Sequence, residues 1–131
     1  MQSIVELIMK ALFRIIQVVC VTAFAGCSGE TVTNSFSNYS EMQSSGIFEK
    51  GWLPRYLPKS AKSIKESHDL DSNTVNATFT FDPTDIASVK ENCNLLEDTE
   101  TVYVFSCEIS GNRAKISLFK NGKAEYKSAA K

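Results

Sequence analysis

Alternation of apolar and polar residues predicts two paired strands in the middle of the chain. Residues 75–81 alternate strictly, which is typical of a strand with one buried face. The side chains expected on that face are Val75, Ala77, Phe79 and Phe81. Residues 63–70 precede this strand and could form its hairpin partner, and the Asx-rich stretch 71–73 favours a turn between the two.

The C-terminal part of the chain predicts three further strands. Residues 101–109 carry apolar side chains on both faces, which indicates a strand near the centre of a sheet. A type II′ turn at 110–113, with glycine first, should lead into a strand at 113–120. Asn121-Gly122 favours a type I′ turn, and residues 123–127 should then form an edge strand guarded by lysines.

One helix is expected between the two groups of strands. Asp82 is a suitable N-cap, Pro83 fits the first helical position, and Asn92 or Asn94 would end the helix. Its predicted buried stripe consists of Ile86, Val89, Cys93 and Leu96. The order β-β-α-β-β-β predicts an α+β fold, an antiparallel sheet of about five strands with one helix on one face.

The N-terminal segment 1–26 reads as a secretory signal. Lys10 and Arg14 precede an apolar stretch, residues 15–26, that ends in small residues. This stretch is shorter than the about 20 residues that a membrane-spanning helix needs. Met9 is an alternative start, and an uncleaved amphipathic anchor is an alternative in which Glu6, Lys10 and Arg14 share one helical face.

The end of this segment, Phe24-Ala25-Gly26-Cys27, resembles the bacterial lipobox, although Phe24 stands where leucine is usual. The resemblance implies cleavage before Cys27 and a lipid thioether on its sulfur, with a palmitate-like acyl chain. Ordinary cleavage after Ala25 is the alternative. In enterobacterial lipoproteins an aspartate after the cysteine retains the protein at the inner membrane. Ser28 occupies that place, which implies the outer membrane, with the domain facing the periplasm.

The cysteine count agrees with lipidation. Of the four cysteines, Cys20 leaves with the signal and Cys27 would carry the lipid. Cys93 and Cys107 then remain as an even pair suited to a disulfide bond in an oxidising compartment. Their predicted places on the helix and on the strand 101–109 would let the bond join helix to sheet. The alternative is that both are small buried apolar residues.

Composition divides the remaining chain into two parts. Residues 27–46 are rich in Ser, Thr, Asn and Gly and are expected to form a flexible tether. Residues 47–131 are expected to form a single small α+β domain. The formal net charge of −1 at pH 7 carries no basic excess, so a nucleic-acid partner is not expected.

The stretch 51–61 is the most distinctive candidate site. Its two Leu-Pro steps favour extended backbone and exclude a regular helix. The partner-binding candidates on it are Trp52, Leu53, Tyr56 and Leu57. The alternative is that the stretch packs against the sheet. The pattern W-x-P-x-x-L-P-x-S-A resembles a segment of small uncharacterised bacterial lipoproteins, a resemblance that implies no activity.

No metal site, cofactor or enzymatic activity is expected. The stretch 68–73 offers oxygen and nitrogen ligands, but Thr74 and Thr80 stand where a calcium loop starting at Asp69 needs Gly and Glu. An Asx-capped turn explains the stretch better. The chain has a single histidine, His68, and lacks the common nucleophile and phosphate-binding motifs.

These features predict an envelope lipoprotein, anchored to the membrane by its lipid, that acts as a protein-binding or assembly module. The alternative function is a tethered inhibitor or immunity-type protein directed against an envelope-attacking enzyme or toxin. The sequence does not identify the protein partner.

Overall fold

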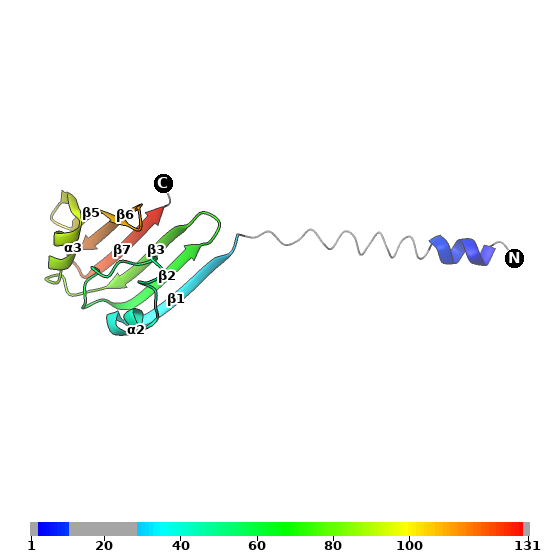
Figure 1. The fold of residues 1–131 in the computed structure, drawn as a ribbon, viewed down its shortest axis with the longest axis horizontal. Coiled ribbons are helices and arrows are strands. Elements are labelled where there is room, and N and C mark those ends of the chain that lie inside the picture. The colour runs from blue at the N-terminus through cyan, green and yellow to red at the C-terminus, as the bar shows by residue number, and fades with distance from the viewer. Residues whose placement is uncertain (1–2, 11–28, 130–131) are drawn as a thin grey trace.

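The computed structural model describes residues 3–10 and 29–129, and it shows a seven-stranded antiparallel sheet with short helices (Figure 1). The strands are β1 (Thr31–Asn38), β2 (Lys62–Asp69), β3 (Thr74–Thr80), β4 (Asn94–Asp98), β5 (Val102–Ile109), β6 (Asn112–Phe119) and β7 (Lys123–Ala129). Their order in the sheet is β1-β2-β3-β7-β6-β5-β4, and every neighbouring pair is antiparallel. The fold is therefore predominantly β, with more strands than the five expected.

The expected tether is wrong over most of its length, because β1 and the helix α2 (Tyr39–Ser44) lie within residues 27–46. β1 pairs with β2 along its length, and its inward side chains Val32 and Phe36 alternate with exposed polar ones. In α2 the Asn38 side chain caps the first turn, and Met42 is fully buried in the core. The polar composition of this segment gave no indication of a strand, because β1 is ordered by pairing with β2, which lies farther along the chain.

The hairpin β2–β3 is confirmed, including the Asx turn between its strands. Asp69 Oδ1 accepts hydrogen bonds from the backbone N–H groups of Asp71 (2.8 Å) and Ser72 (3.0 Å). These bonds lower the pKa of Asp69. All four side chains predicted on the buried face of 75–81 are buried.

The positions of the last strands in the sheet differ from the prediction. β7 is the central strand, between β3 and β6, rather than an edge strand. Its residues Ala124, Tyr126 and Ser128 are buried, and its lysines point to the exposed face, where they guard no edge. β5 is not central, because β4 pairs with its outer side.

Two of the predicted hairpins exist, with different turn types. Ser110 and Gly111 both have positive φ (50° and 80°), which is the type I′ pattern, so the type II′ prediction is wrong. At the β6–β7 turn only Gly122 has positive φ (89°), and its N–H donates to the carbonyl of Phe119. A type I turn followed by a left-handed glycine therefore replaces the predicted type I′ turn.

The predicted helix is shorter than expected. α3 (Ala87–Asn92) has six residues, and Asp82 caps the preceding turn instead, accepting from the backbone of Thr84. Val89 is fully buried as predicted, whereas Leu96 lies in β4 and is 64% exposed. Leu96 continued the helical spacing in the sequence, but pairing of this segment with β5 makes it a strand.

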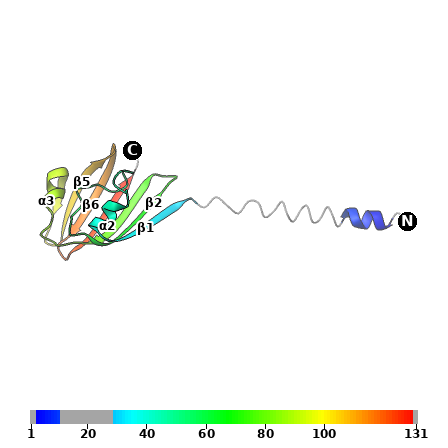
Figure 2. The same cartoon turned by 60° about the horizontal axis from the view of Figure 1, so that its bottom comes forward.

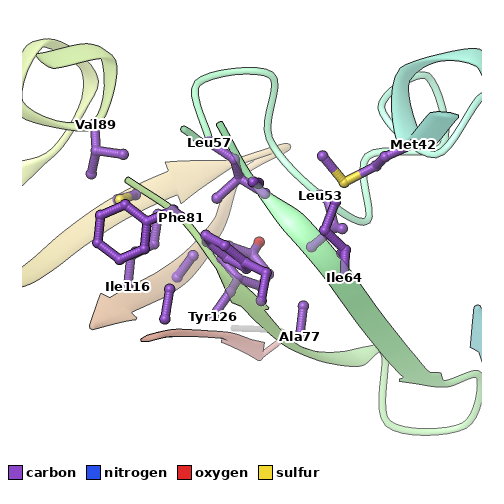
Figure 3. Packing of buried hydrophobic residues seen from close by; sticks show 14 of the residues in the cluster. Met42, Leu53, Leu57, Ile64, Ala77, Phe81, Val89, Ile116 and Tyr126 are labelled. Atoms are coloured by element: carbon purple, nitrogen blue, oxygen red, sulfur yellow. The ribbon is translucent and has the colours of Figure 1, made fainter. Parts of the chain in front are cut away.

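One face of the sheet is covered and holds the core. α2 lies against β1 and β2, α3 lies beside β5, and the long connection between α2 and β2 crosses the space between them (Figure 2). Figure 3 shows Leu53 and Leu57 of that connection above Ala77 and Tyr126 of the strands. The buried apolar side chains contributed by the connection are Ile47, Phe48, Leu53, Pro54, Leu57, Pro58 and Ala61.

The predicted disulfide bond is present between Cys93, at the end of α3, and Cys107 on β5. Residues 3–10 form a helix, and none of the helices in the described ranges has the length and apolar character needed to cross a membrane. Most of the predicted signal segment, together with Cys20 and Cys27, lies outside the described residues.

Candidate functional site

A buried polar cluster lies on the covered face where β1, β2 and β3 meet. Strand pairing arranges the inward-facing residues in rows across the sheet. One row contains Asn34, Glu66, Ala77 and Tyr126, and the next contains Val32, His68, Val75 and Ser128. Glu66 and His68 are therefore neighbours on the same face of β2, and they are only 2% and 3% exposed.

Hydrogen bonds join this cluster across two strands. The amide of Asn34 donates from Nδ2 to Glu66 Oε2 at 2.7 Å. Glu66 Oε1 lies 2.8 Å from His68 Nδ1, and the two atoms form a buried hydrogen bond. Both carboxylate oxygens are thus occupied, which offsets the large cost of removing a carboxylate from water. The cluster also ties the edge strand β1 to β2 through side chains as well as backbone.

The other ring nitrogen of His68 is enclosed and has no hydrogen-bond partner within residues 29–129. The Trp52 ring stacks on the imidazole, with the ring centroids 3.6 Å apart. A carboxylate-oriented imidazole with a free nitrogen is an arrangement that other proteins use for proton transfer or metal binding. Here the ring is only 3% exposed and the free nitrogen itself is buried, so this conformation leaves no access for a ligand.

The connection that carries Trp52 is held to both halves of the sheet. Trp52 contacts His68 on β2, and the Lys50 ammonium lies 4.7 Å from the centre of its ring. Tyr56 donates from its hydroxyl to the carbonyl of Glu108, at the far end of β5, over 3.3 Å. Burial, together with the nearby Tyr126, raises the pKa of Tyr56 to about 12. The stretch 51–61 is therefore a packed cover over the sheet.

The four partner-binding candidates on this stretch separate into two groups. Leu53 and Leu57 are 1% and 0% exposed and belong to the core, so their assignment to a binding patch is wrong. Trp52 and Tyr56 are partly exposed and pack against the core along one side. Each Leu-Pro pair points toward the core, and the residues between the pairs point outward. The leucines are therefore buried, and the rings of Trp52 and Tyr56 lie at the edge of the core.

The ligand-rich stretch 68–73 does not converge on a metal site. His68 points into the core, while Asp69 caps the hairpin turn. Across residues 3–10 and 29–129, no group of three or more His, Cys, Asp or Glu side chains is placed to hold a metal ion. The lipidation candidate Cys27 lies outside the described residues.

The opposite, open face of the sheet is broad and polar. The exposed side chains of β2, β3 and β7 include Lys65, Thr78 and Glu125, which lie in one row. A hollow of about 500 Å³ on this face is lined by residues that include these three. In the neighbouring row Lys115 and Lys127 are direct cross-strand partners, and both are exposed.

Sequence reasoning missed the two residues that complete the buried cluster, Asn34 and Glu66. Glu66 lies two residues from Ile64 and two residues from His68, so all three side chains face the same side of β2. This spacing was the feature of the sequence that could have predicted the burial of Glu66. A glutamate is rarely buried unless it is paired, and its partner Asn34 lies in the segment expected to be flexible. The cluster could not be recognised until β1 was recognised as a strand.

Comparison with known proteins adds one family. A family model described as the YbbD head domain matches residues 30–80, less than half of the chain. The matched residues run from β1 to β3 and contain Asn34, Trp52, Glu66 and His68. No curated protein sequence and no solved structure matches the chain. Over the strands that build the buried cluster, the chain is therefore similar to the YbbD head domain family.

Proposed function

We propose that the chain is a lipoprotein of the bacterial cell envelope, anchored through Cys27, whose open sheet face binds a protein partner. The anchor is supported by the Ala-Gly-Cys boundary in the sequence. The binding function rests on one observation, the facing lysines Lys115 and Lys127 on the uncovered side of the sheet.

Like charges placed directly opposite each other on neighbouring strands destabilise a sheet. Lys115 and Lys127 are exposed and form no salt bridge with any residue among 29–129. Bound acidic groups would relieve their repulsion. The breadth of the open face suits a protein surface, since small-molecule sites are usually concave and largely enclosed. The partner is therefore an envelope protein that presents carboxylates to this face.

Because residues 31–38 form the strand β1 and not part of a flexible tether, only a short segment separates the sheet from the proposed anchor at Cys27. Residues 28–30 can span at most about 10 Å, so an acylated Cys27 would hold β1 near the lipid surface. The proposed module therefore acts on partners at the membrane surface and has no long reach. We place it at the outer membrane, facing the periplasm, on the basis of Ser28.

A photo-crosslinking residue at Asn76, which pairs with Lys127 on the open face, tests the binding surface in intact cells. We expect an adduct with an envelope protein that disappears when Lys115 and Lys127 are both changed to Glu. Lys59→Glu, an equal charge change per site on the covered side of the molecule, should leave the adduct intact.

The identity of the captured protein decides between the two functions considered from the sequence. A resident envelope protein supports the binding or assembly module, whereas a secreted hydrolase or toxin added to the cells would identify a tethered inhibitor. An adduct that survives the double lysine change, or no adduct at Asn76, would contradict the assignment of the open face.

The lipid anchor is tested separately. Cys27→Ala should abolish incorporation of a palmitate analogue, because the thioether requires the Cys27 sulfur, and the protein should leave the membrane fraction or accumulate as precursor. Cys93→Ala, which removes a cysteine outside the boundary motif, should retain the label and serves as the control. Unchanged membrane retention of Cys27→Ala without a lipid label would contradict the anchor.

A further inference from the structure

The two edges of the sheet differ in how well they are protected. β4 has five residues, its pairing with β5 shifts register between Leu95 and Glu97, and it carries two acidic residues. Short length, bulges and charge are devices by which proteins prevent an edge strand from pairing with another chain. β1 has eight residues, none of them charged and none proline, and its pairing with β2 is regular from Thr31 to Phe36.

The hydrogen bond just before β1 shows which backbone groups of its first half face outward. Leu70 donates from its backbone N–H to the carbonyl of Glu30, so the even-numbered residues of β1 are bonded to β2. In an antiparallel pair the alternate residues then direct their N–H and C=O groups away from the partner. On β1 these are Thr31, Thr33, Ser35 and Ser37.

One of these outward groups is already occupied. The N–H of Ser37 donates to the Glu41 side chain at 2.7 Å, so α2 closes this end of the edge. Within residues 29–129, β1 contacts β2 and α2 (Figure 1), and the backbone from Thr31 to Ser35 forms the open part of the edge. An exposed strand of this kind accepts another extended strand by main-chain hydrogen bonds.

We infer that β1 pairs with β1 of a second copy of this chain, in antiparallel orientation and centred on Thr33. This register places Thr31 opposite Ser35 of the other copy and forms about six backbone hydrogen bonds. It leaves Ser37 and Glu41 outside the shared ladder, so the existing hydrogen bond between them is preserved. The even-numbered residues of β1 face the covered side in both copies, and the odd-numbered residues face the open side. The covered layers of the two copies therefore lie on the same side of one continuous sheet.

The chemistry of β1 selects a second copy over an oppositely charged partner. An uncharged strand brings no like charges together when it meets itself, and it offers no charge that would attract a different strand. Threonine pairs across the two strands are favourable, and Thr33 would face Thr33 at the two-fold axis. In this register Thr31 of one copy lies about 14 Å from Thr31 of the other, so two short anchors could reach one membrane.

The test is the self-association of the full chain, purified from membranes in detergent and measured by sedimentation equilibrium under density-matched conditions. The unchanged chain should form a dimer whose population rises with protein concentration. Thr33→Pro removes an outward N–H and leaves the bonds to β2 intact, and we expect at least a tenfold weaker association. Thr33→Val keeps the backbone and the strand preference and should dimerise like the unchanged chain.

A second variant guards against a folding defect in the proline variant. Thr33→Lys places two ammonium groups together at the two-fold axis, so its dimer should weaken at low salt and recover as salt increases. Circular dichroism and an intact Cys93–Cys107 bond would show that each variant is folded. If the unchanged chain were monomeric at every concentration, or if the Pro and Lys variants dimerised as strongly as the unchanged chain at low salt, the proposal would be overturned. These outcomes do not depend on partner capture at Asn76.

Discussion

Replacing His68 with leucine is expected to lower the free energy of unfolding by about 3–5 kcal/mol. The reason is the position of Glu66, whose side chain is fully buried and bonded to His68 Nδ1 at 2.8 Å. Without the imidazole, the carboxylate keeps only the Asn34 amide as a partner, and an incompletely paired buried charge is strongly unfavourable. Urea unfolding of the purified chain, with its disulfide bond intact, measures the change.

A second substitution separates loss of the Glu66–His68 hydrogen bond from loss of packing. Adding Glu66→Leu to His68→Leu should recover most of the stability, because the buried carboxyl group that lost its partner is then replaced by an apolar side chain. Ser67→Leu, between the two residues but on the open face, should change the stability by no more than about 0.5 kcal/mol. If the double variant were no more stable than His68→Leu alone, the unpaired Glu66 carboxyl group would not be the cause of the loss.

Removing the disulfide bond with Cys93→Ala and Cys107→Ala is expected to cost about 3 kcal/mol. The bond closes a loop with a sequence separation of 14 residues and thereby restricts the unfolded chain. It also anchors the end of α3, a six-residue helix too short to be stable without tertiary contacts. Urea unfolding with and without reductant measures the loss.

Hydrogen exchange should locate the effect of the missing bond. We expect faster exchange in α3 and β4, which lie next to Cys93, and little change in β2 and β3 at the other end of the sheet. Thiol titration of the denatured, unreduced chain should find no reactive Cys93 or Cys107. Equal stability of the oxidised and reduced chains would contradict a stabilising role for the bond.

Strands that carry their own apolar alternation were predictable from the sequence. The hairpin β2–β3 and the pair β5–β6 follow from alternating residues joined by turn residues that are close in the sequence. The Cys93–Cys107 pair was predictable because the cysteine count and the inward positions of both residues agreed. These features depend on interactions within short segments, which local patterns describe well.

β1, β4 and the place of β7 were not predictable in the same way. The polar sequence of β1 suits a tether as well as an edge strand, and only pairing with β2 makes it ordered. β4 continued the spacing of a helix, and the lysines of β7 suggested an edge although they line the open face. Each of these errors concerns a long-range pairing that leaves no local periodic signal.

In the candidate site, too, some features were predictable from the sequence and others depended on the tertiary structure. The sequence determined that residues 51–61 are stiff and apolar, that His68 is the single imidazole, and that Cys27 stands at a lipobox-like boundary. Only the tertiary structure decided that Leu53 and Leu57 are core residues, and that Trp52 covers a buried Glu66–His68 pair. A charged residue enters a core only where residues distant in the sequence supply its hydrogen bonds, and the order of strands in the sheet brings those residues together.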